Sequence, residues 1–283
     1  MSSPREPTRD EALGQLISTA HRQLERDWRL LTTAQQSVLN ALATARRRGA
    51  RPGAVPTAVR QALTAFTAAT ARFNTDVGAL VERWTAVDLP RAYRLGAEDA
   101  LGSAVLVSAT TRRPVFDWGP AHQAVLSVLT AACYPVLIRR VADVVRRAQA
   151  FARAAATAAR APEPPTTADL ATQHPLDTVP YGRGTQHPAA SWALAALSAQ
   201  SVTAANTGAL TATTTDLEAR WVQVTDGPEC GWTSHPELDR AHDTLRSAVE
   251  AATYPIAHPG CLRRFIPRPD LNHDPAIEEG QPL

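Results

Sequence analysis

Apolar residues recur every three or four positions over most of the first 160 residues, which is the period of an amphipathic helix. The stripe Leu13–Leu42 predicts one long helix from Thr8 to about Arg48. Thr8 and Glu11 have the spacing of a capping box, in which each side chain accepts a hydrogen bond from a backbone N–H at the helix start. We therefore expect the first helix to begin at Thr8.

Two more helices are predicted after a turn at 51–56. Apolar residues over Val59–Trp84 repeat nearly as heptads, which predicts a long helix with a seam that needs a partner. A shorter helix is expected over Leu89–Leu101, after a break at Asp88. Gly96 lies in this shorter helix, and we expect its missing side chain to let another helix approach closely.

The most apolar run of the chain, Ala124–Ile138, lies in a further helix predicted from Pro120 to Phe151. Pro135 is expected to bend or interrupt this helix, because proline lacks a backbone N–H. The run is also shorter than the roughly 20 residues that a membrane helix needs. We therefore expect no membrane-spanning segment. Cys133 falls on the apolar stripe and is expected to be a buried, inert thiol.

Turn signals separate shorter elements in the second half of the chain. The sequence predicts a hairpin over Val179–His187, a helix over Ala189–Thr213 and a strand over Ala219–Thr225. A short helix is expected within 238–252. This order is typical of a small α+β module.

Two turns rich in Gly and Pro carry the candidate chemistry. Cys230 and His235 lie in the first turn, and His258 and Cys261 lie in the second. Together they predict a structural zinc site with two cysteine and two histidine ligands. The spacing differs from that of a common zinc finger, and the same residues also fit two buried thiols, or a disulfide, with histidines at the turns. His242 is a fifth candidate ligand.

These elements predict a mainly α protein, with an elongated helical N-terminal domain and a small α+β C-terminal module closed by a Cys/His clip. The expected division is a helical domain at 1–161, a linker at 162–177, the module at 178–270 and a disordered tail at 271–283. The linker and the tail are rich in proline and polar residues, which is typical of segments without a packed core.

Charge is distributed unevenly along a chain whose 29 basic residues are all arginine. Residues 1–160 hold 22 arginines against 12 acidic residues, and the remainder holds 7 against 15. A basic first half permits contact with nucleic acid or an acidic protein, but arginines at helical spacing also fit a solvated helix face, which we prefer. Three cysteines without a signal sequence favour a reducing compartment over a disulfide framework.

The clip also carries a resemblance to a known family. The segments DGPECGWTSH at 226–235 and PIAHPGC at 255–261, with the arginines that follow, resemble the C-terminal module of phage Mu F-type minor head proteins. Weaker likeness extends to WTAVDLPRAYRLGAEDAL at 84–101 and SVTAANTGALTA at 201–212. Where the family pattern reads His-Pro-Asn-Cys-Arg, this chain has His-Pro-Gly-Cys-Leu at 258–262.

This resemblance implies a structural virion protein that acts in phage head morphogenesis and is assembled in the host cytoplasm. The implied location is the capsid interior or the portal vertex, and the implied partners are the portal protein, the capsid interior and, by non-specific contact, packaged DNA. It implies no membrane partner. It also implies no enzymatic activity, so we expect no catalytic residue and no cofactor other than structural zinc.

Two other functions fit the sequence less well. One is a zinc-stabilised nucleic-acid-binding protein that uses the basic first half. The other is a metal-dependent hydrolase with Glu229 or Glu237 as its base, but the chain has no HExxH, Walker or Gly-x-Ser-x-Gly motif. Asn206, within the conspicuous segment at 201–212, is expected to form structural hydrogen bonds and not to be catalytic.

Overall fold

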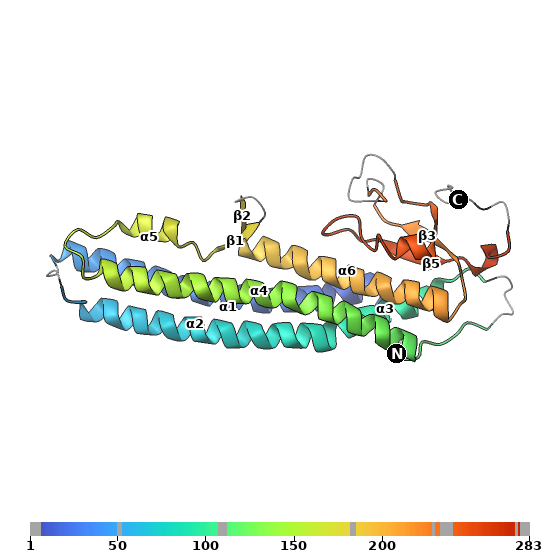
Figure 1. Ribbon diagram of the computed structural model, residues 1–283, viewed down its shortest axis with the longest axis horizontal. Helices are drawn as coiled ribbons and strands as arrows, with labels where there is room; N and C mark the ends of the chain where they lie inside the picture. The colour runs from blue at the N-terminus through green and yellow to red at the C-terminus, as the bar shows by residue number, and fades with distance from the viewer. Residues whose placement is uncertain are drawn as a thin grey trace, which may run out of the picture. The chain divides into compact units, whose positions relative to one another are not determined.

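We describe the fold from a computed structural model, which describes residues 7–49, 53–106, 112–181, 185–227, 230–232, 240–274 and 277. The protein is mainly helical with a small sheet-containing C-terminal region, as the sequence predicts. The helical elements (Figure 1) are α1 (Arg9–Arg47), α2 (Thr57–Arg83), the π-helical segment η1 (Trp84–Asp88), α3 (Leu89–Ser103), α4 (Pro120–Ala158), α5 (Thr167–Gln173), α6 (Ala189–Thr215), α7 (Ala248–Ala251) and the 3-10 turn η2 (Pro269–Leu271).

The strands form two small antiparallel sheets. A hairpin pairs β1 (Thr178–Tyr181) with β2 (Thr185–Pro188), and a three-stranded sheet has the order β4-β3-β5, with β3 (Trp221–Thr225) between β4 (Leu245–Ser247) and β5 (Arg264–Pro267). The predicted hairpin and the predicted strand before Cys230 are thus confirmed. The structure adds a strand, β4, to the region where only a short helix was predicted, and β5 was not predicted.

The chain divides into two compact units, and both take residues from α1, α4 and α6. Unit 1 consists of Met1–Thr19, Arg83–Cys133 and Leu194–Leu283, and unit 2 consists of Ala20–Glu82 and Tyr134–Ala193. The units interleave along the sequence. The domain boundaries expected from the sequence stay a prediction.

Aromatic side chains form the core of unit 2. The Trp28 ring meets Phe73 edge-on at a centroid distance of 5.3 Å, and Phe66 meets Phe151 in the same way at 5.1 Å. These side chains come from α1, α2 and α4, and the three phenylalanines are at most 2% exposed. Trp28 also donates its indole N–H to the Leu176 carbonyl at 2.6 Å, so a buried polar group of the core is satisfied.

A short helix lies inside the predicted linker of unit 2. The side chain of Thr166 caps α5 by accepting from the Asp169 N–H, and the Asp169 carboxylate accepts from the Thr166 N–H. This reciprocal capping box satisfies two backbone donors at the helix start. The segment 162–177 is therefore not wholly without regular structure. The sequence carries the capping signal of this helix, because Thr166 and Asp169 are three residues apart.

In unit 1, α1 begins where its capping signal predicted. The Thr8 N–H donates to the Glu11 carboxylate at 2.8 Å, and the Glu11 N–H donates to the Thr8 hydroxyl at 3.3 Å. The structured helix starts at Arg9, one residue later. Both hydrogen bonds of the predicted capping box are present.

Helices α3 and α6 approach each other closely because two glycines face the opposite backbone. A Cβ atom placed on Gly96 would lie 1.8 Å from the Ala205 carbonyl oxygen, and one placed on Gly208 would lie 2.1 Å from the Tyr93 carbonyl oxygen. Real side chains cannot occupy either position without moving a helix backbone. The expectation that Gly96 permits close approach is confirmed.

The predicted break at Asp88 is wrong, and Pro135, which was expected to bend or interrupt its helix, does not interrupt it. The chain does not break at Asp88 but stays helical through η1, where the Leu89 N–H donates to the Trp84 carbonyl across five residues. The wider turn precedes Pro90, whose missing N–H could not continue the regular ladder. Similarly, α4 runs without interruption through Pro135.

Among the described helices, α4 is long and apolar enough to cross a membrane. By length and composition alone, its best 18-residue window qualifies with a mean hydropathy of 1.5, and 17% of that window is buried. The expected absence of a membrane span rests partly on an interruption at Pro135, which the structure does not contain. A single helix that meets this test also occurs in soluble proteins, and the expected absence of a membrane partner stays a prediction.

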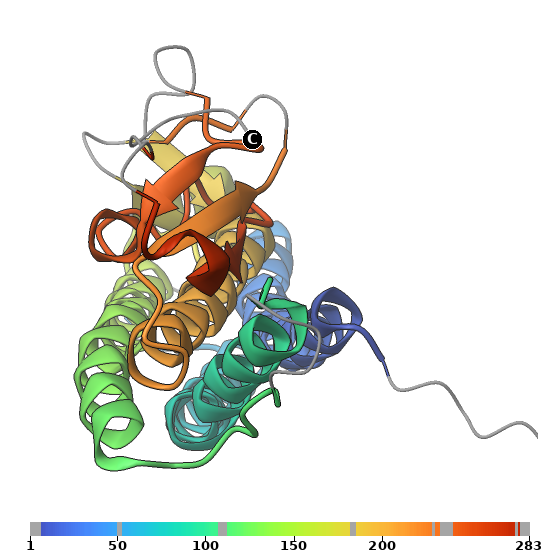
Figure 2. The ribbon, with the colours of Figure 1, turned by 90° about the vertical axis from the view of Figure 1, so that its right-hand side faces the viewer.

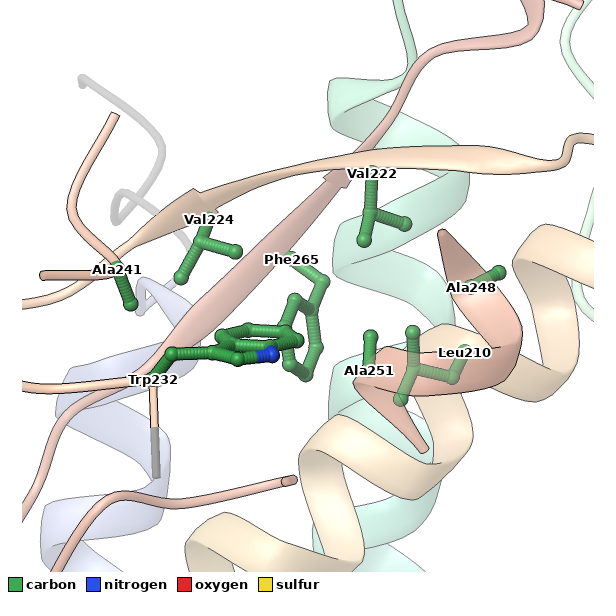
Figure 3. Close-up of a cluster of buried hydrophobic side chains, with 8 residues drawn as sticks. All are labelled: Leu210, Val222, Val224, Trp232, Ala241, Ala248, Ala251 and Phe265. Atoms are coloured by element: carbon green, nitrogen blue, oxygen red, sulfur yellow. The ribbon is translucent and has the colours of Figure 1, made fainter. Parts of the chain in front are cut away.

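The C-terminal sheet packs against α6 around an indole ring. Figure 3 shows Val222 and Val224 projecting from β3 toward Trp232 and Phe265, and in Figure 2 the sheet lies over α6. The remaining members of this buried cluster are Leu210 from α6, Ala241, and Ala248 and Ala251 from α7. This small core stabilises the C-terminal region that contains the two turns of the predicted Cys/His clip.

Candidate metal centre

Cys230 lies in a loop that follows β3 and is fixed by backbone hydrogen bonds. Its N–H donates to the Gly227 carbonyl at 2.9 Å, and its carbonyl accepts from the Ala241 N–H at 3.2 Å. A Cβ atom on Gly227 would lie 3.3 Å from the Cys230 sulfur, so glycine leaves room for the thiol at this turn. The loop therefore positions the sulfur through its backbone.

The second half of the clip is a tight turn over residues 258–261. The Cys261 N–H donates to the His258 carbonyl at 3.0 Å, and Gly260 has a φ of +86°, which favours glycine. His258 Nδ1 lies 3.1 Å from the Pro259 carbonyl oxygen and donates its proton there. The Nε2 lone pair of His258 then faces the Cys230 sulfur. A hydrogen bond of this kind is how metal-binding histidines are commonly oriented.

Three of the four predicted ligands converge. His258 Nε2 lies 3.3 Å from the Cys230 sulfur, and the sulfurs of Cys230 and Cys261 are 3.8 Å apart. Two sulfurs bound tetrahedrally to zinc at about 2.3 Å would lie about 3.8 Å apart. All three candidate ligand atoms lie within 4.8 Å of one another. Cys230, His258 and Cys261 could therefore hold a metal ion.

The other candidate ligands do not join this group in the described part of the chain. His235 lies outside the described residues, as do Glu229 and Glu237. His242 instead accepts a hydrogen bond at Nδ1 from the Asp226 N–H at 3.1 Å, and its Nε2 lies 3.3 Å from the Asp243 carboxylate. His242, the fifth candidate ligand, thus uses both ring nitrogens in contacts with Asp226 and Asp243.

The two cysteines are buried, whereas His258 is exposed. All three cysteines of the chain are free thiols, so the disulfide alternative is not what the structure shows. Burial, followed by the neighbouring Cys261, raises the pKa of the Cys230 thiol. A metal ion would favour the thiolate form, which is the form that binds metals. Cys133 lies elsewhere, is 8% exposed, and has a pKa raised to about 11 by burial, which confirms a buried thiol.

Arg263 holds the two halves of the clip together. Its side chain is fully buried and donates four hydrogen bonds, one from Nε to the Asp226 carboxylate and three to backbone carbonyls, while its Nη2 also lies 2.9 Å from the Asp226 carboxylate in an ion pair. Those carbonyls belong to Gly231 and Trp232, directly after Cys230, and to Tyr254, four residues before His258. One guanidinium therefore connects both loops that carry candidate ligands.

The ion pair of Arg263 with Asp226 is buried on both sides. Burial raises the pKa of the Asp226 carboxyl, and the Arg263 charge acts in the opposite direction. The guanidinium also lies 5.0 Å from the centroid of the Trp232 ring, a distance at which a cation is attracted to an indole. The sequence indicated only a basic end to the module. No local sequence signal places the Arg263 side chain inward, because its partners lie on distant loops.

Asn206 connects the clip to the start of α1. Its side chain donates to the carbonyls of Pro255 and Arg263 at 2.6 and 2.9 Å, and it accepts from Arg9 at 2.7 Å. Asn206 is completely buried. The prediction of a structural hydrogen-bonding role for this residue is confirmed.

A second buried polar group, which the sequence did not predict, lies among α3, α4 and the end of α6. The Tyr93 hydroxyl lies 2.8 Å from His122 Nδ1, and His122 Nε2 lies 3.1 Å from the Asp216 carboxylate. Burial raises the pKa of Tyr93 to about 12. No sequence motif brings these residues together, because each comes from a different segment of the chain.

Comparison with known proteins adds no function to this geometry. No family model, no curated protein and no solved structure matches the chain. The resemblance to Mu F-type proteins therefore stays a prediction. What the centre can do chemically follows from its own side chains, which are two soft sulfur ligands and one imidazole.

Proposed function

We propose that the protein is a non-enzymatic structural protein of the virion, a minor head protein of the Mu F type, whose C-terminal module is held by a structural zinc ion. The observation that carries this proposal is the convergence of Cys230, His258 and Cys261 from two loops separated by about 30 residues of chain. The motif resemblance of the same segments supplies the virion role.

Zinc suits this set of ligands better than other common ions. Thiolate and imidazole together are typical of structural zinc, whereas calcium and magnesium take oxygen ligands. His235 is the proposed fourth ligand, which would close the coordination shell. A closed shell leaves no position for a reacting water, and a metal that joins two loops stabilises a module whose own apolar core is small.

Metal analysis of purified protein tests the zinc site. We expect about one zinc per chain, lost in Cys230→Ser, His258→Ala, Cys261→Ser and His235→Ala. Cys133→Ala and His242→Ala are matched controls, because neither residue belongs to the proposed site, and both should keep their zinc. Zinc content that does not change when Cys230 or Cys261 is replaced would contradict the site.

Mass spectrometry of purified phage particles tests the virion role. We expect the protein in particles that carry its gene, and we expect the portal protein to co-purify with it from mildly disrupted heads. Particles that assemble and package DNA normally without containing the protein would contradict the role. Zinc-dependent hydrolysis of ester or phosphodiester substrates, abolished by His258→Ala, would instead indicate an enzyme.

A further inference from the structure

The exposed arginines of unit 2 include two groups, which differ in whether a carboxylate lies beside them. In the first group, Arg29, Arg72 and Arg146 each pair at 3.1 Å with an acidic residue three or four positions away on the same helix. These three fit the solvated helix face expected from the sequence. In the second group, no carboxylate of the described residues lies within ion-pair distance, and its members are Arg47, Arg48, Arg60 and Arg160.

The chain around the second group holds no acidic residue over long distances. Residues 28–75 contain seven arginines and no Asp or Glu, and residues 144–162 contain four arginines and no Asp or Glu. The first segment comprises most of α1 and α2, and the second comprises the last part of α4. Packing these helices together concentrates positive charge, because none of the three segments brings a carboxylate with it.

These segments meet at one end of unit 2, which we call the arginine-rich end. There α1 ends, α2 begins and α4 ends (Figure 1). The Gly53 N–H, in the loop before α2, donates to the Arg160 carbonyl at 3.0 Å. The Arg46 guanidinium, near the end of α1, donates to the Pro165 carbonyl. The four arginines of the second group are therefore collected at this end from three helices.

Helix dipoles explain only part of this collection. The C-terminal end of a helix attracts cations, so Arg47 in the last turn of α1 is favourably placed. Arg60 has the opposite position, because it is the fourth residue of α2 and the positive end of a helix disfavours a cation. The first turn of α2 also contains no acidic residue. The charge of Arg60 is therefore not explained by helix stability.

Two acidic residues follow α4 in the chain, and neither pairs with the four arginines. Hydrogen bonds from Thr166 lower the pKa of the Asp169 carboxyl, and the Arg46 charge lowers it further. Asp169 is thus used in the capping box of α5 and lies near an arginine outside the group. Glu163 is exposed and has no ion-pair partner among the described residues. The charge of the four arginines is not neutralised by the described part of the chain.

We propose that the arginine-rich end of unit 2 binds the phosphate backbone of a nucleic-acid duplex without reading its sequence. The planar guanidinium of arginine matches the geometry of a phosphate group. Packed helices lie about 8–10 Å apart, so three helix ends can reach several phosphates of a duplex that carries one charge per about 1.7 Å of its axis. The proposal rests on unit 2 alone and does not depend on the zinc site or on the virion role.

Two other polyanions fit this end less well. Proteins hold single-stranded nucleic acid largely by stacking bases on aromatic side chains, and residues 40–65 and 152–173 contain no Phe, Tyr or Trp. An interface with an acidic protein has an apolar core, and none of the large apolar side chains exposed in the described residues lies in these two ranges. A duplex backbone needs neither feature, because it is contacted through charge.

Fluorescence anisotropy of a labelled DNA duplex, titrated with the full chain at several salt concentrations, tests the proposal. Four phosphate contacts predict a slope of about −3.6 for log K against log salt, so the affinity should fall about 100-fold between about 50 and 200 mM NaCl. The combined variant Arg47→Gln, Arg48→Gln, Arg60→Gln and Arg160→Gln should bind at least tenfold more weakly at low salt, with a slope near zero. Arg47→Gln with Arg48→Gln alone should reduce the slope by about two, which keeps the test valid if the combined variant does not fold.

The matched control replaces four arginines that pair with carboxylates: Arg29→Gln, Arg72→Gln, Arg94→Gln and Arg146→Gln. It lowers the net charge by the same amount and should keep the wild-type slope. All eight arginines are exposed, so circular dichroism should show wild-type helicity in both combined variants.

Three further ligands identify the partner. A DNA duplex of shuffled sequence should bind with the same affinity, and comparison with an RNA duplex of the same sequence shows which duplex is bound more tightly. Poly-L-glutamate represents an acidic protein. Absence of duplex binding at low salt, equal weakening in the combined variant and its control, or tighter binding of poly-L-glutamate than of either duplex would overturn the proposal.

Discussion

The missing side chain of Gly96 is one of two that set how closely α3 and α6 pack. Because the Ala205 carbonyl oxygen occupies the place of a side chain at Gly96, Gly96→Ala must push two helix backbones apart. We expect it to lower the free energy of unfolding by about 3 kcal/mol or more, at the upper end of overpacking effects. Urea unfolding followed by circular dichroism measures this change.

Gly78→Ala is the matched control for this substitution. Gly78 lies inside α2, and nothing is within 4 Å of the position that its Cβ would take. The same glycine-to-alanine change should therefore raise stability by about 0.5–1 kcal/mol, because alanine favours the helix. Equal effects at both positions would mean that helix propensity, and not the close approach, determines the result.

The hydroxyl of Tyr93 predicts a loss of stability in alkali. Burial raises its pKa to about 12 from 10, so between these values the folded protein keeps a proton that the unfolded chain has lost. The unfolded state then binds fewer protons, and the free energy of unfolding falls as pH rises from 10 to 12. Tyr93→Phe should make this fall smaller.

Unfolding by urea at several pH values between 9 and 12 measures the effect of Tyr93→Phe. A Cys133→Ala background is useful, because burial also raises the pKa of Cys133 to about 11 and that thiol would titrate in an overlapping range. Identical pH dependence with and without the Tyr93 hydroxyl would show that its titration is not linked to folding.

Residues whose role depends on neighbours in sequence were predictable, and those whose role depends on distant segments were not. Thr8 and Glu11 are three residues apart, and their capping box follows from that spacing. Cys230, His258 and Cys261 could be grouped because their turns stand out in composition. Nothing local indicates that Arg263 donates to three carbonyls of other loops.

At the scale of elements, Arg263, the residue directly before β5, connects the two loops of the clip through its hydrogen bonds. Arg263→Met would leave the Asp226 carboxylate buried without its counter-ion and the carbonyls of Gly231, Trp232 and Tyr254 without their donor. Breaking one side of a buried ion pair typically costs about 3–5 kcal/mol. We expect a loss of this size in thermal or urea unfolding.

Two further variants separate the effect of the Arg263 charge from the effect of its hydrogen bonds to the three carbonyls. Arg264→Met removes the neighbouring arginine, which pairs with Asp99 but is 35% exposed, and should cost about 1 kcal/mol or less. Adding Asp226→Asn to Arg263→Met removes the unpaired charge and should recover part of the loss. Full recovery would show that the three carbonyl contacts contribute nothing.

Helix periodicity located the long helices, but it could not place the elements that tertiary contacts determine. β5 has four residues. It pairs with β3 at the register Val224↔Phe265, so its position depends on a strand that lies about 40 residues earlier in the sequence. Similarly, a proline in sequence indicates a bent or interrupted helix, yet α4 is not interrupted at Pro135 and the chain passes Pro90 by way of a π-helical turn. These outcomes depend on packing, which propensity does not describe.

At the scale of the whole molecule, all three converging candidate metal ligands belong to one compact unit. Unit 1 contains Cys230, His258 and Cys261, whereas the described residues of unit 2 contribute none of the three. If zinc stabilises the clip, its removal should act mainly on the part of the chain around these ligands. Metal binding to a folded site adds its free energy to the stability of the structure that forms the site.

Hydrogen exchange measured by mass spectrometry, with and without EDTA, tests this distribution. We expect amides in β3 and in residues 241–267 to exchange at least tenfold faster after zinc is removed, because the two loops lose their shared ligand and local opening becomes easier. Amides of α2 between residues 57 and 82 should keep their protection.

Cys133→Ala should show the same response to EDTA as wild type, and Cys261→Ser should show fast exchange without EDTA. Equal loss of protection in α2 and in the clip would mean that the metal holds the entire protein together, and no loss in either would mean that the clip is stable through Arg263 and its small core alone.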